Sequence, residues 1–525
     1  MNDPNGLWYD AKEELYHMYF QYNPEDNIWG SPLYWGHAVS DDLTTWEERG
    51  IALGPKTNDS AAFSGSAVVD VDNTSGFFND TTDPRQRVVA IWTHNAPDKQ
   101  SQYVSYSVDG GDTFIEYENN PVLDLNSTQF RDPKVIWHEE TKKWIMIVAM
   151  SQKYEIAIYS SDDLVDWTYE SAFGNAGYLG FQYECPGLVK VPVVQTEQGG
   201  LTVSNLTYPN TTSYNSTYFN ATNTSTVNNE AWVMFLSIYP GGPLGGSATQ
   251  YFIGDFNGTH FEPFTTQARF LDLGKDYYAV QTFYNSPNAD EVLGIAWASN
   301  WQYAQNVPTY EWRSSMSLAR NFTLREYSPN PESVQLNLNS EPVLNANPVE
   351  AQNATFSFED ELLLIDNELS GNFPSNISAT AIEFEIEWSV NEIAFNITEL
   401  NGFVLSLATD DYDEFLTFGY EANAQSFFFN RGNTEEPFVY ANPFFNEKLS
   451  VYLEPYSTSS NGTNTYKVHG IVDQNIAELY FNDGSVVSTN LFFTTPGNQL
   501  TWWSVDTSID GGFKLDNFTI SVLDV

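Results

Sequence analysis

In the last third of the chain, apolar and polar residues alternate strictly. In AIEFEIEWSV (residues 381–390), Ile382, Phe384 and Ile386 fall on one side of an extended chain and the glutamates between them fall on the other. A period of two is typical of an antiparallel strand with one buried face. Similar runs recur from residue 351 to residue 525, so the pattern predicts a β-sandwich there.

The first two thirds of the chain repeat a longer pattern. An apolar strand, an Asp- or Gly-rich turn and a strand with an aromatic residue occur four times, as HAVSDDLTTWEE, SYSVDGGDTFIEY, IYSSDDLVDWTYE and YFIGDFNGTHFEPF. Each copy follows two more apolar strands, and a fifth such pair lies at YYAVQTFYN and VLGIAWASN. Five four-stranded units predict a five-bladed β-propeller, which closes radially and leaves only short edges.

The predicted organisation is therefore all-β, with a propeller over residues 1–335, a linker over 336–350 and a lectin-like β-sandwich over 351–525. A Ser-, Thr- and Asn-rich stretch, residues 201–229, interrupts the fourth unit. We expect this stretch to be a surface loop.

Charge and cysteine content exclude several functions. The chain has 69 acidic and 21 basic residues and a formal net charge of −48, which would repel nucleic acid and anionic membranes and favours a neutral substrate. Its one cysteine, Cys185, allows neither an intramolecular disulfide nor a cysteine zinc site. No apolar run approaches the ~20 residues of a membrane span.

Sixteen Asn-x-Ser/Thr sequons occur along the chain, five of them within residues 201–229. This density predicts an N-glycosylated protein secreted to the extracellular, cell-wall or periplasmic space. Because no positively charged segment or apolar segment precedes Met1, we expect that a signal peptide is absent from this sequence.

Three carboxylates lie at the entrances of predicted first strands, in Asn2-Asp3-Pro4, Arg131-Asp132-Pro133 and Glu184-Cys185-Pro186. If these strands line the propeller axis, the three acids converge there. A pair of carboxylates flanking a sugar is the minimum equipment for glycoside hydrolysis. Asp-Pro is also a common turn dipeptide, but recurrence at matching repeat positions favours the catalytic interpretation.

The residues also suggest how the two catalytic roles are divided. Glu184 lies among aromatic residues, which favour the protonated form of an acid, whereas Asp3 lies beside turn amides, which favour an ion. By themselves the residues leave this division open.

Four ordered motifs, MNDPNG, FSGS, FRDPKV and ECPG, resemble glycoside hydrolase family 32, and within it the yeast secreted invertases and inulinases. FQYNP, WGHA, GIAWASNW and WRSSMS match as well, so the resemblance covers the whole chain. It implies a propeller followed by a sandwich. It also implies a retaining, exo-acting β-fructofuranosidase that releases terminal β-D-fructofuranosyl units from sucrose and short fructans through a fructosyl-enzyme intermediate.

The resemblance also implies roles for individual residues. Asp3 corresponds to the nucleophile, Glu184 to the acid/base and Asp132 to the transition-state stabiliser, with Arg131 tuning Glu184. The implied substrate-binding residues are Asn2, Gln21, Trp29, Phe63, Ser64, Arg131 and Trp297; we add Trp301 and Tyr303 as candidates for outer subsites.

Alternatives and partners follow from the same residues. An inulinase-type fructan exohydrolase or a fructosyltransferase of the same family would use the same site, and the segment 201–229 leaves the preferred chain length open. A non-catalytic glycan-binding lectin is a remote alternative, because pure binding does not need an acid and a nucleophile together. We expect no cofactor and no metal site, and the resemblance implies a homodimer or higher homo-oligomer with sandwich surfaces involved.

Overall fold

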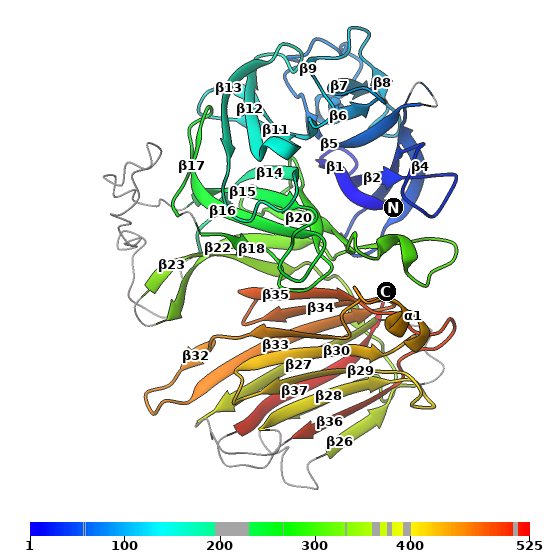
Figure 1. The fold of residues 1–525 in the computed structure, drawn as a ribbon, viewed down its shortest axis with the longest axis vertical. Helices are drawn as coiled ribbons and strands as arrows, with labels where there is room; N and C mark the ends of the chain where they lie inside the picture. Colours follow the sequence, from blue (N-terminus) through cyan, green and yellow to red (C-terminus); the bar gives the residue numbers. More distant parts are fainter. Residues whose placement is uncertain are drawn as a thin grey trace.

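The computed structural model describes residues 1–525 except 56, 58, 195–229, 266, 331–332, 360–367, 375–380, 392–400 and 508–512. The surface loop expected at 201–229 lies outside the described residues. The described chain is almost entirely β-structure, in two stacked parts (Figure 1). The upper part holds five small sheets, and the lower part holds two large ones.

Each small sheet is built from consecutive antiparallel strands. The first contains β1 (Asn2–Asp10), β2 (Leu15–Tyr22), β3 (Tyr34–Ser40) and β4 (Glu47–Leu53), and the second contains β5 (Ala61–Val69), β6 (Val88–Asn95), β7 (Gln100–Ser107), β8 (Ile115–Glu116) and β9 (Leu123–Ser127). The third contains β10 (Arg131–His138), β11 (Lys143–Met150), β12 (Glu155–Ser161) and β13 (Thr168–Gly174). The fourth contains β14 (Tyr183–Pro192), β15 (Glu230–Ile238), β16 (Ala248–Phe256), β17 (Phe261–Pro263) and β18 (Arg269–Phe270), and the fifth contains β19 (Tyr278–Thr282), β20 (Leu293–Ala298), β21 (Ser315–Met316), β22 (Arg320–Asn330) and β23 (Ser333–Pro342).

The first strands of the five sheets contact one another in a closed ring, in the order β1, β5, β10, β14, β19 and back to β1. The sheets are therefore the blades of a five-bladed propeller, and the fold class predicted from the repeats is confirmed. Inner strands such as β11 (KWIMIVAM) are apolar on both faces because blades pack on both sides of them, whereas the outer strand β13 (TYESAFG) is largely solvent-accessible.

The lower part is a β-sandwich. One sheet contains β24 (Asn347–Pro348), β25 (Thr355–Glu359), β27 (Ala381–Val390), β32 (Ser457–Thr458), β33 (Asn464–Asp473), β34 (Ile476–Phe481), β35 (Val486–Leu491) and β37 (Phe513–Asp524). The other contains β26 (Glu368–Asn372), β28 (Gly402–Ala408), β29 (Phe415–Glu421), β30 (Ser426–Asn433), β31 (Lys448–Tyr452) and β36 (Trp502–Thr507), and the helix α1 (Glu436–Ala441) follows β30. The alternation in β27 holds, with Phe384 and Trp388 in the core and Glu385 exposed.

The boundary between the two parts differs from the expected linker. β23 pairs with β22, so the fifth blade runs to Pro342, and the segment 336–350 begins inside a strand. Leu336 and Leu338 alternate with asparagines and are buried in the propeller core, which explains why this segment is extended and paired.

Candidate active site

A break in the register of strand pairing lies near the entrance of every first strand. The breaks fall between Asn2 and Pro4, Phe63 and Gly65, Arg131 and Lys134, Glu184 and Gly187, and Tyr278 and Gln281. Irregularities of this kind bend the strand and re-aim a side chain. Within three of them a non-glycine residue has a positive φ, namely 63° at Asp132, 45° at Cys185 and 56° at Ala279, a conformation that is uncommon and concentrates at functional sites.

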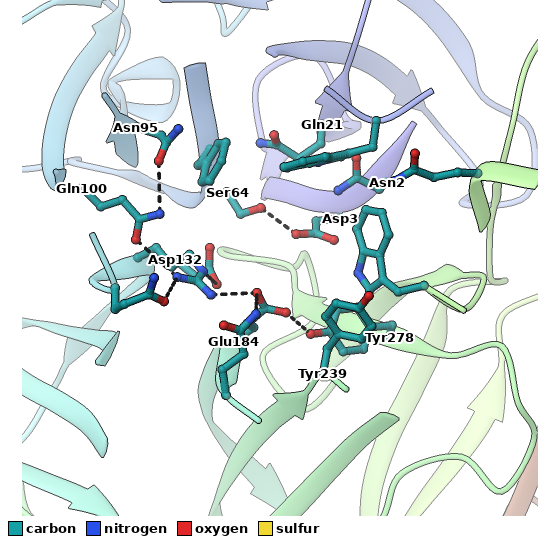
Figure 2. A pocket seen from close by; sticks show the side chains of 17 residues that line it. Asn2, Asp3, Gln21, Ser64, Asn95, Gln100, Asp132, Glu184, Tyr239 and Tyr278 are labelled. Atoms are coloured by element: carbon teal, nitrogen blue, oxygen red, sulfur yellow. Dashed lines mark hydrogen bonds and ion pairs between the residues drawn. The ribbon is translucent and has the colours of Figure 1, made fainter. Parts of the chain in front are cut away.

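These entrances surround a cavity of about 390 Å³ at the propeller axis (Figure 2). The side chains that line it are mainly carboxylates, amides and aromatic rings. They are Asn2, Asp3, Gln21, Trp29, Phe63, Ser64, Asn95, Gln100, Gln129, Arg131, Asp132, Gln182, Glu184, Tyr239, Tyr278, Trp301 and Gln305.

Asp3 projects into the cavity from the first blade. Its Oδ2 accepts a hydrogen bond from Ser64 Oγ at 2.8 Å and one from Cys185 Sγ at 3.5 Å. Its Oδ1 is buried and has no partner among the described residues. Burial raises the pKa of Asp3, and the Ser64 hydroxyl opposes this rise. Oδ1 is therefore the Asp3 oxygen that accepts no hydrogen bond within the described chain.

Glu184 faces Asp3 from the fourth blade and is held at both oxygens (Figure 2). Oε1 accepts from Arg131 Nη2 at 2.9 Å and from Gln182 Nε2 at 2.9 Å, and Oε2 accepts a short hydrogen bond from the Tyr278 hydroxyl. Burial raises the pKa of Tyr278 well above its usual range, so this hydroxyl stays a donor. Three groups from three blades thus fix the orientation of one carboxyl group.

Asp132 lies near the other two acids, whose charges act on it. Its Oδ2 accepts from the Cys185 amide at 3.0 Å, and its own backbone amide donates to Thr93 Oγ1 at 3.0 Å. Burial raises the pKa of Asp132 to about 7, opposed by Arg131 and reinforced by the charges of Glu184 and Asp3. The three acids therefore form one electrostatically coupled cluster.

Of the substrate-binding residues implied by the sequence, all but Trp297 line the cavity. The Trp297 side chain is buried behind the wall and packs against Trp301, with ring centroids 4.7 Å apart. Trp301 lines the cavity, but Tyr303 is completely buried, with its hydroxyl on Asp276. Tyr303 is therefore not an outer-subsite residue, because a Trp-x-Tyr spacing places the second ring on the inner side of this loop.

Sequence reasoning missed Tyr278 and Gln182, the two neutral partners of Glu184. Tyr278 is the last paired residue before the register break at the entrance of the fifth first strand, the position that Glu184 holds in the fourth blade. The strand-entrance rule would have found it if applied to neutral residues as well as to acids. Within the described residues, no group of three or more His, Cys, Asp or Glu side chains is arranged to hold a metal ion, and no helix there is long and apolar enough to cross a bilayer.

An axial cavity with opposed carboxyl groups, one with an unpartnered oxygen and one held by proton donors, is the equipment of a glycoside hydrolase. The amides and aromatic rings around it suit the hydroxyls and apolar faces of a sugar. Fold and site together therefore define the chain as an enzyme of this class.

Comparison with known proteins places it more narrowly. Residues 1–335 match the family model for the glycosyl hydrolases family 32 N-terminal domain, and residues 351–521 match the model for the C-terminal domain. The chain belongs to glycosyl hydrolases family 32. It is 52% identical to "Invertase 2" of Saccharomyces cerevisiae over 530 residues, covering 99% of this chain and 92% of that protein.

Two further relatives are informative. The "Extracellular exo-inulinase" of Meyerozyma guilliermondii is 44% identical over 515 residues, covering 97% of this chain and 90% of the relative. The solved structure of β-fructofuranosidase from Schwanniomyces occidentalis complexed with fructosyl-erythritol is 43% identical, with a TM-score of 0.87 and coverage of 100% of this chain and 95% of that one.

Proposed function

We propose that this chain is a retaining, exo-acting β-fructofuranosidase that releases terminal β-D-fructofuranosyl units from sucrose and short fructans. The observation that carries the proposal is the opposition of Asp3, with its unpartnered Oδ1, and Glu184, held by Arg131 and Tyr278, across one cavity. The similarity to an invertase, an exo-inulinase and a fructosyl-erythritol complex supports fructose as the sugar.

In the first step, Asp3 Oδ1 attacks the anomeric carbon of the fructosyl unit while Glu184 donates a proton to the departing glycosidic oxygen. The bond to the leaving sugar breaks and a fructosyl ester on Asp3 forms. In the second step, Glu184 takes a proton from water, whose oxygen attacks the same carbon and regenerates Asp3. Two displacements at one carbon retain its configuration.

Asp132 and the neutral side chains complete the site. Asp132 accepts hydrogen bonds from fructose hydroxyls and stabilises the positive charge that develops on the sugar ring. Arg131 orients Glu184. Asn2, Gln21, Phe63 and Ser64 bind fructose, and Trp29 with Trp301 forms an aromatic wall at the cavity mouth, since these two rings meet edge to face with centroids 6.0 Å apart.

Acceptor choice and chain length belong to the same proposal. When a sugar hydroxyl replaces water in the second step, the Asp3 ester yields fructosyl transfer. An inulinase-type exohydrolase would differ in the length of chain that it accepts beyond Trp29 and Trp301.

We also propose that the protein is secreted and N-glycosylated. Five sequon asparagines are exposed in the described chain: Asn79, Asn126, Asn257, Asn353 and Asn461. The extracellular exo-inulinase among the relatives agrees with this location. Mass analysis before and after endoglycosidase treatment tests occupancy of the sequons.

The domain division and the assembly are proposals as well. We assign residues 1–335 to the catalytic domain and 351–525 to the sandwich, with β23 carrying the fifth blade on to Pro342 within the intervening segment, and we propose a homodimer or larger homo-oligomer that uses sandwich surfaces. Size-exclusion chromatography of the deglycosylated protein tests the assembly, and a single monomer peak at micromolar concentration would contradict it.

The decisive test is product analysis with sucrose, 1-kestose and inulin. We expect wild-type protein to release fructose from all three, with the β-anomer appearing first by NMR. Asp3→Ala should lose activity by several orders of magnitude while remaining folded, and Asp112→Ala, an exposed carboxylate of the same domain, should not. In Glu184→Ala, azide should restore activity, because an external anion can replace the missing base. No release by wild type from any substrate would leave a glycan-binding lectin.

A further inference from the structure

A buried aspartate joins the sandwich to the active-site wall. Asp276 precedes β19 by two residues, and its side chain is completely inaccessible to solvent. Its Oδ2 accepts from Arg431 Nη1 at 3.0 Å and from the Leu491 amide at 2.8 Å, both in the sandwich. Its Oδ1 accepts the short hydrogen bond from the Tyr303 hydroxyl, in the propeller. The Asp276 carboxylate is therefore bonded to the sandwich through one oxygen and to the propeller through the other.

Arg431, on β30, is held as firmly as its partner. Its guanidinium is fully buried, and it donates to Asn446 O at 2.8 Å and Leu491 O at 2.5 Å. The guanidinium carbon lies 3.6 Å from the centroid of the Phe445 ring, a cation–π contact. A buried charge pair fixed at this many points is rigid, and it cannot shift without leaving a charge unpaired.

Asp276 is connected to the catalytic site through two residues of backbone. Two residues further on, Tyr278 donates its hydroxyl hydrogen bond to Glu184 Oε2. The backbone amide of Asp276 donates to Thr489 O of β35 at 3.0 Å. The segment that leads into Tyr278 is therefore hydrogen-bonded to the sandwich through its backbone as well.

A second route runs through the loop that carries Trp301. Tyr303 is tied to Asp276 by its hydroxyl, and Asn300 Nδ2 donates to Lys275 O at 2.9 Å. The two segments that supply Tyr278 and the aromatic cavity wall are therefore joined to each other at residues 275 and 276.

We propose that Arg431 is a positioning residue for the reaction: through Asp276 it sets the place of the Tyr278 hydroxyl, and through that hydroxyl the orientation of the Glu184 carboxyl group. The sandwich then contributes to proton delivery without touching substrate. This inference rests on the proposed acid/base role of Glu184 and extends it to the other domain.

A pair of substrates with different leaving groups tests the inference. Sucrose needs a proton on its departing oxygen, whereas 4-nitrophenyl β-D-fructofuranoside releases a stable phenolate and needs almost none. General acid catalysis raises the rate by a factor of about 10² to 10⁴. An acid that is present but misplaced should therefore lower the rate by only part of this factor. In Arg431→Lys, which keeps the charge and loses the planar fork, we expect kcat/KM for sucrose to fall about tenfold and kcat/KM for the aryl fructoside to change less than about twofold.

Two controls separate positioning from general damage. Arg320 is equally buried at the same boundary, with Nη1 3.0 Å from Asp272 and Nη2 2.9 Å from Glu478. Arg320→Lys should lower the melting temperature without changing the ratio of the two activities. If Arg431→Lys does not fold, Tyr303→Phe, which deletes one hydroxyl on Asp276, should still lower kcat/KM for sucrose relative to the aryl fructoside.

A double-mutant cycle with Tyr278→Phe completes the test. If Arg431 acts through Tyr278, adding Arg431→Lys to Tyr278→Phe should cause little further loss on sucrose, so the effects are not additive. Equal losses on both substrates, or additive effects, would overturn the inference while wild-type activity still supported the proposed function. Failure of the proposed function would instead appear as a wild type that cleaves neither substrate.

Discussion

Removing the Ser64 hydroxyl should move the acidic limb of the pH–activity profile without disturbing the fold. Ser64 Oγ donates to Asp3 Oδ2 at 2.8 Å and stabilises the ionised form that a nucleophile needs. Burial raises the pKa of Asp3, and the Ser64 hydrogen bond is the largest contribution that lowers it. In Ser64→Ala the pKa of Asp3 should therefore rise further.

The expected size of the shift follows from the hydrogen bond. A hydrogen bond to a charged group contributes about 1.5–3 kcal/mol, and a shift of one pH unit corresponds to about 1.4 kcal/mol. Because Asp3 lies in an open cavity where water can replace part of the hydroxyl's effect, we expect the lower end, about one pH unit.

The sign follows from the protonation state. Activity needs ionised Asp3, so it is lost as the pH falls through the pKa of Asp3, and a higher pKa moves this loss to higher pH. The measurement is kcat/KM for sucrose from pH 3 to pH 8, since kcat/KM reports ionisations of the free enzyme. At pH values well below the acidic limb, kcat/KM for sucrose should be about tenfold lower in Ser64→Ala than in wild type. This loss comes in addition to any pH-independent loss of sugar binding.

Ser66→Ala is the matched control. Ser66 lies two residues further along β5, is equally buried, and its hydroxyl accepts from the Val135 amide at 2.9 Å. Its substitution should leave the limb in place. A Ser64→Ala profile that is lower at every pH but has an unmoved limb would refute the argument, because Ser64 would then act only on the substrate.

Three further predictions concern other parts of the propeller. Cys185 is buried and burial raises the pKa of its thiol well above the usual range, so iodoacetamide should label it only after unfolding, as measured by intact mass. His17 and His37 are buried, with His17 Nδ1 3.0 Å from His37 Nε2, and burial lowers the pKa of His17 to about 3 and that of His37 to about 4. Because the unfolded state binds more protons than the folded state below pH 6.5, the melting temperature should fall as the pH drops from 6.5 toward 4. The fall should be less steep in His37→Gln, which has one such histidine fewer. Trp29→Ala should raise KM for 1-kestose about tenfold with a much smaller change in kcat, because this half-exposed ring at the cavity mouth contributes binding alone.

The fold could be predicted from the sequence because its signals are local. Blade strands and sandwich strands can each be recognised within about ten residues from apolar runs, alternation and turn residues. The composition after residue 336 did not reveal β23, because its linker-like residues masked the two alternating leucines, Leu336 and Leu338, that continue the fifth blade.

What escaped prediction depends on contacts between distant residues. Tyr278 and Glu184 are 94 residues apart, and Arg431 and Asp276 are 155 apart. No periodicity connects such pairs. Trp297 and Trp301 illustrate the limit at short range, because both are aromatic and four residues apart, yet only the second reaches the cavity wall.

The ring of strand entrances explains why the site is chemically balanced. Blades one, three and four place Asp3, Asp132 and Glu184 at the axis, where burial and the neighbouring carboxylates raise the pKa of Asp3 and of Asp132. Blades two and five place neutral donors at their own strand entrances: Ser64 donates to Asp3, and Tyr278 donates to Glu184. Asp3, Ser64 and Asp132 directly follow the last paired residue before the register break, whereas Glu184 and Tyr278 are that last paired residue. The fivefold repeat thus supplies five strand entrances around one axis, and the catalytic asymmetry arises from which entrances carry an acid and which carry a donor.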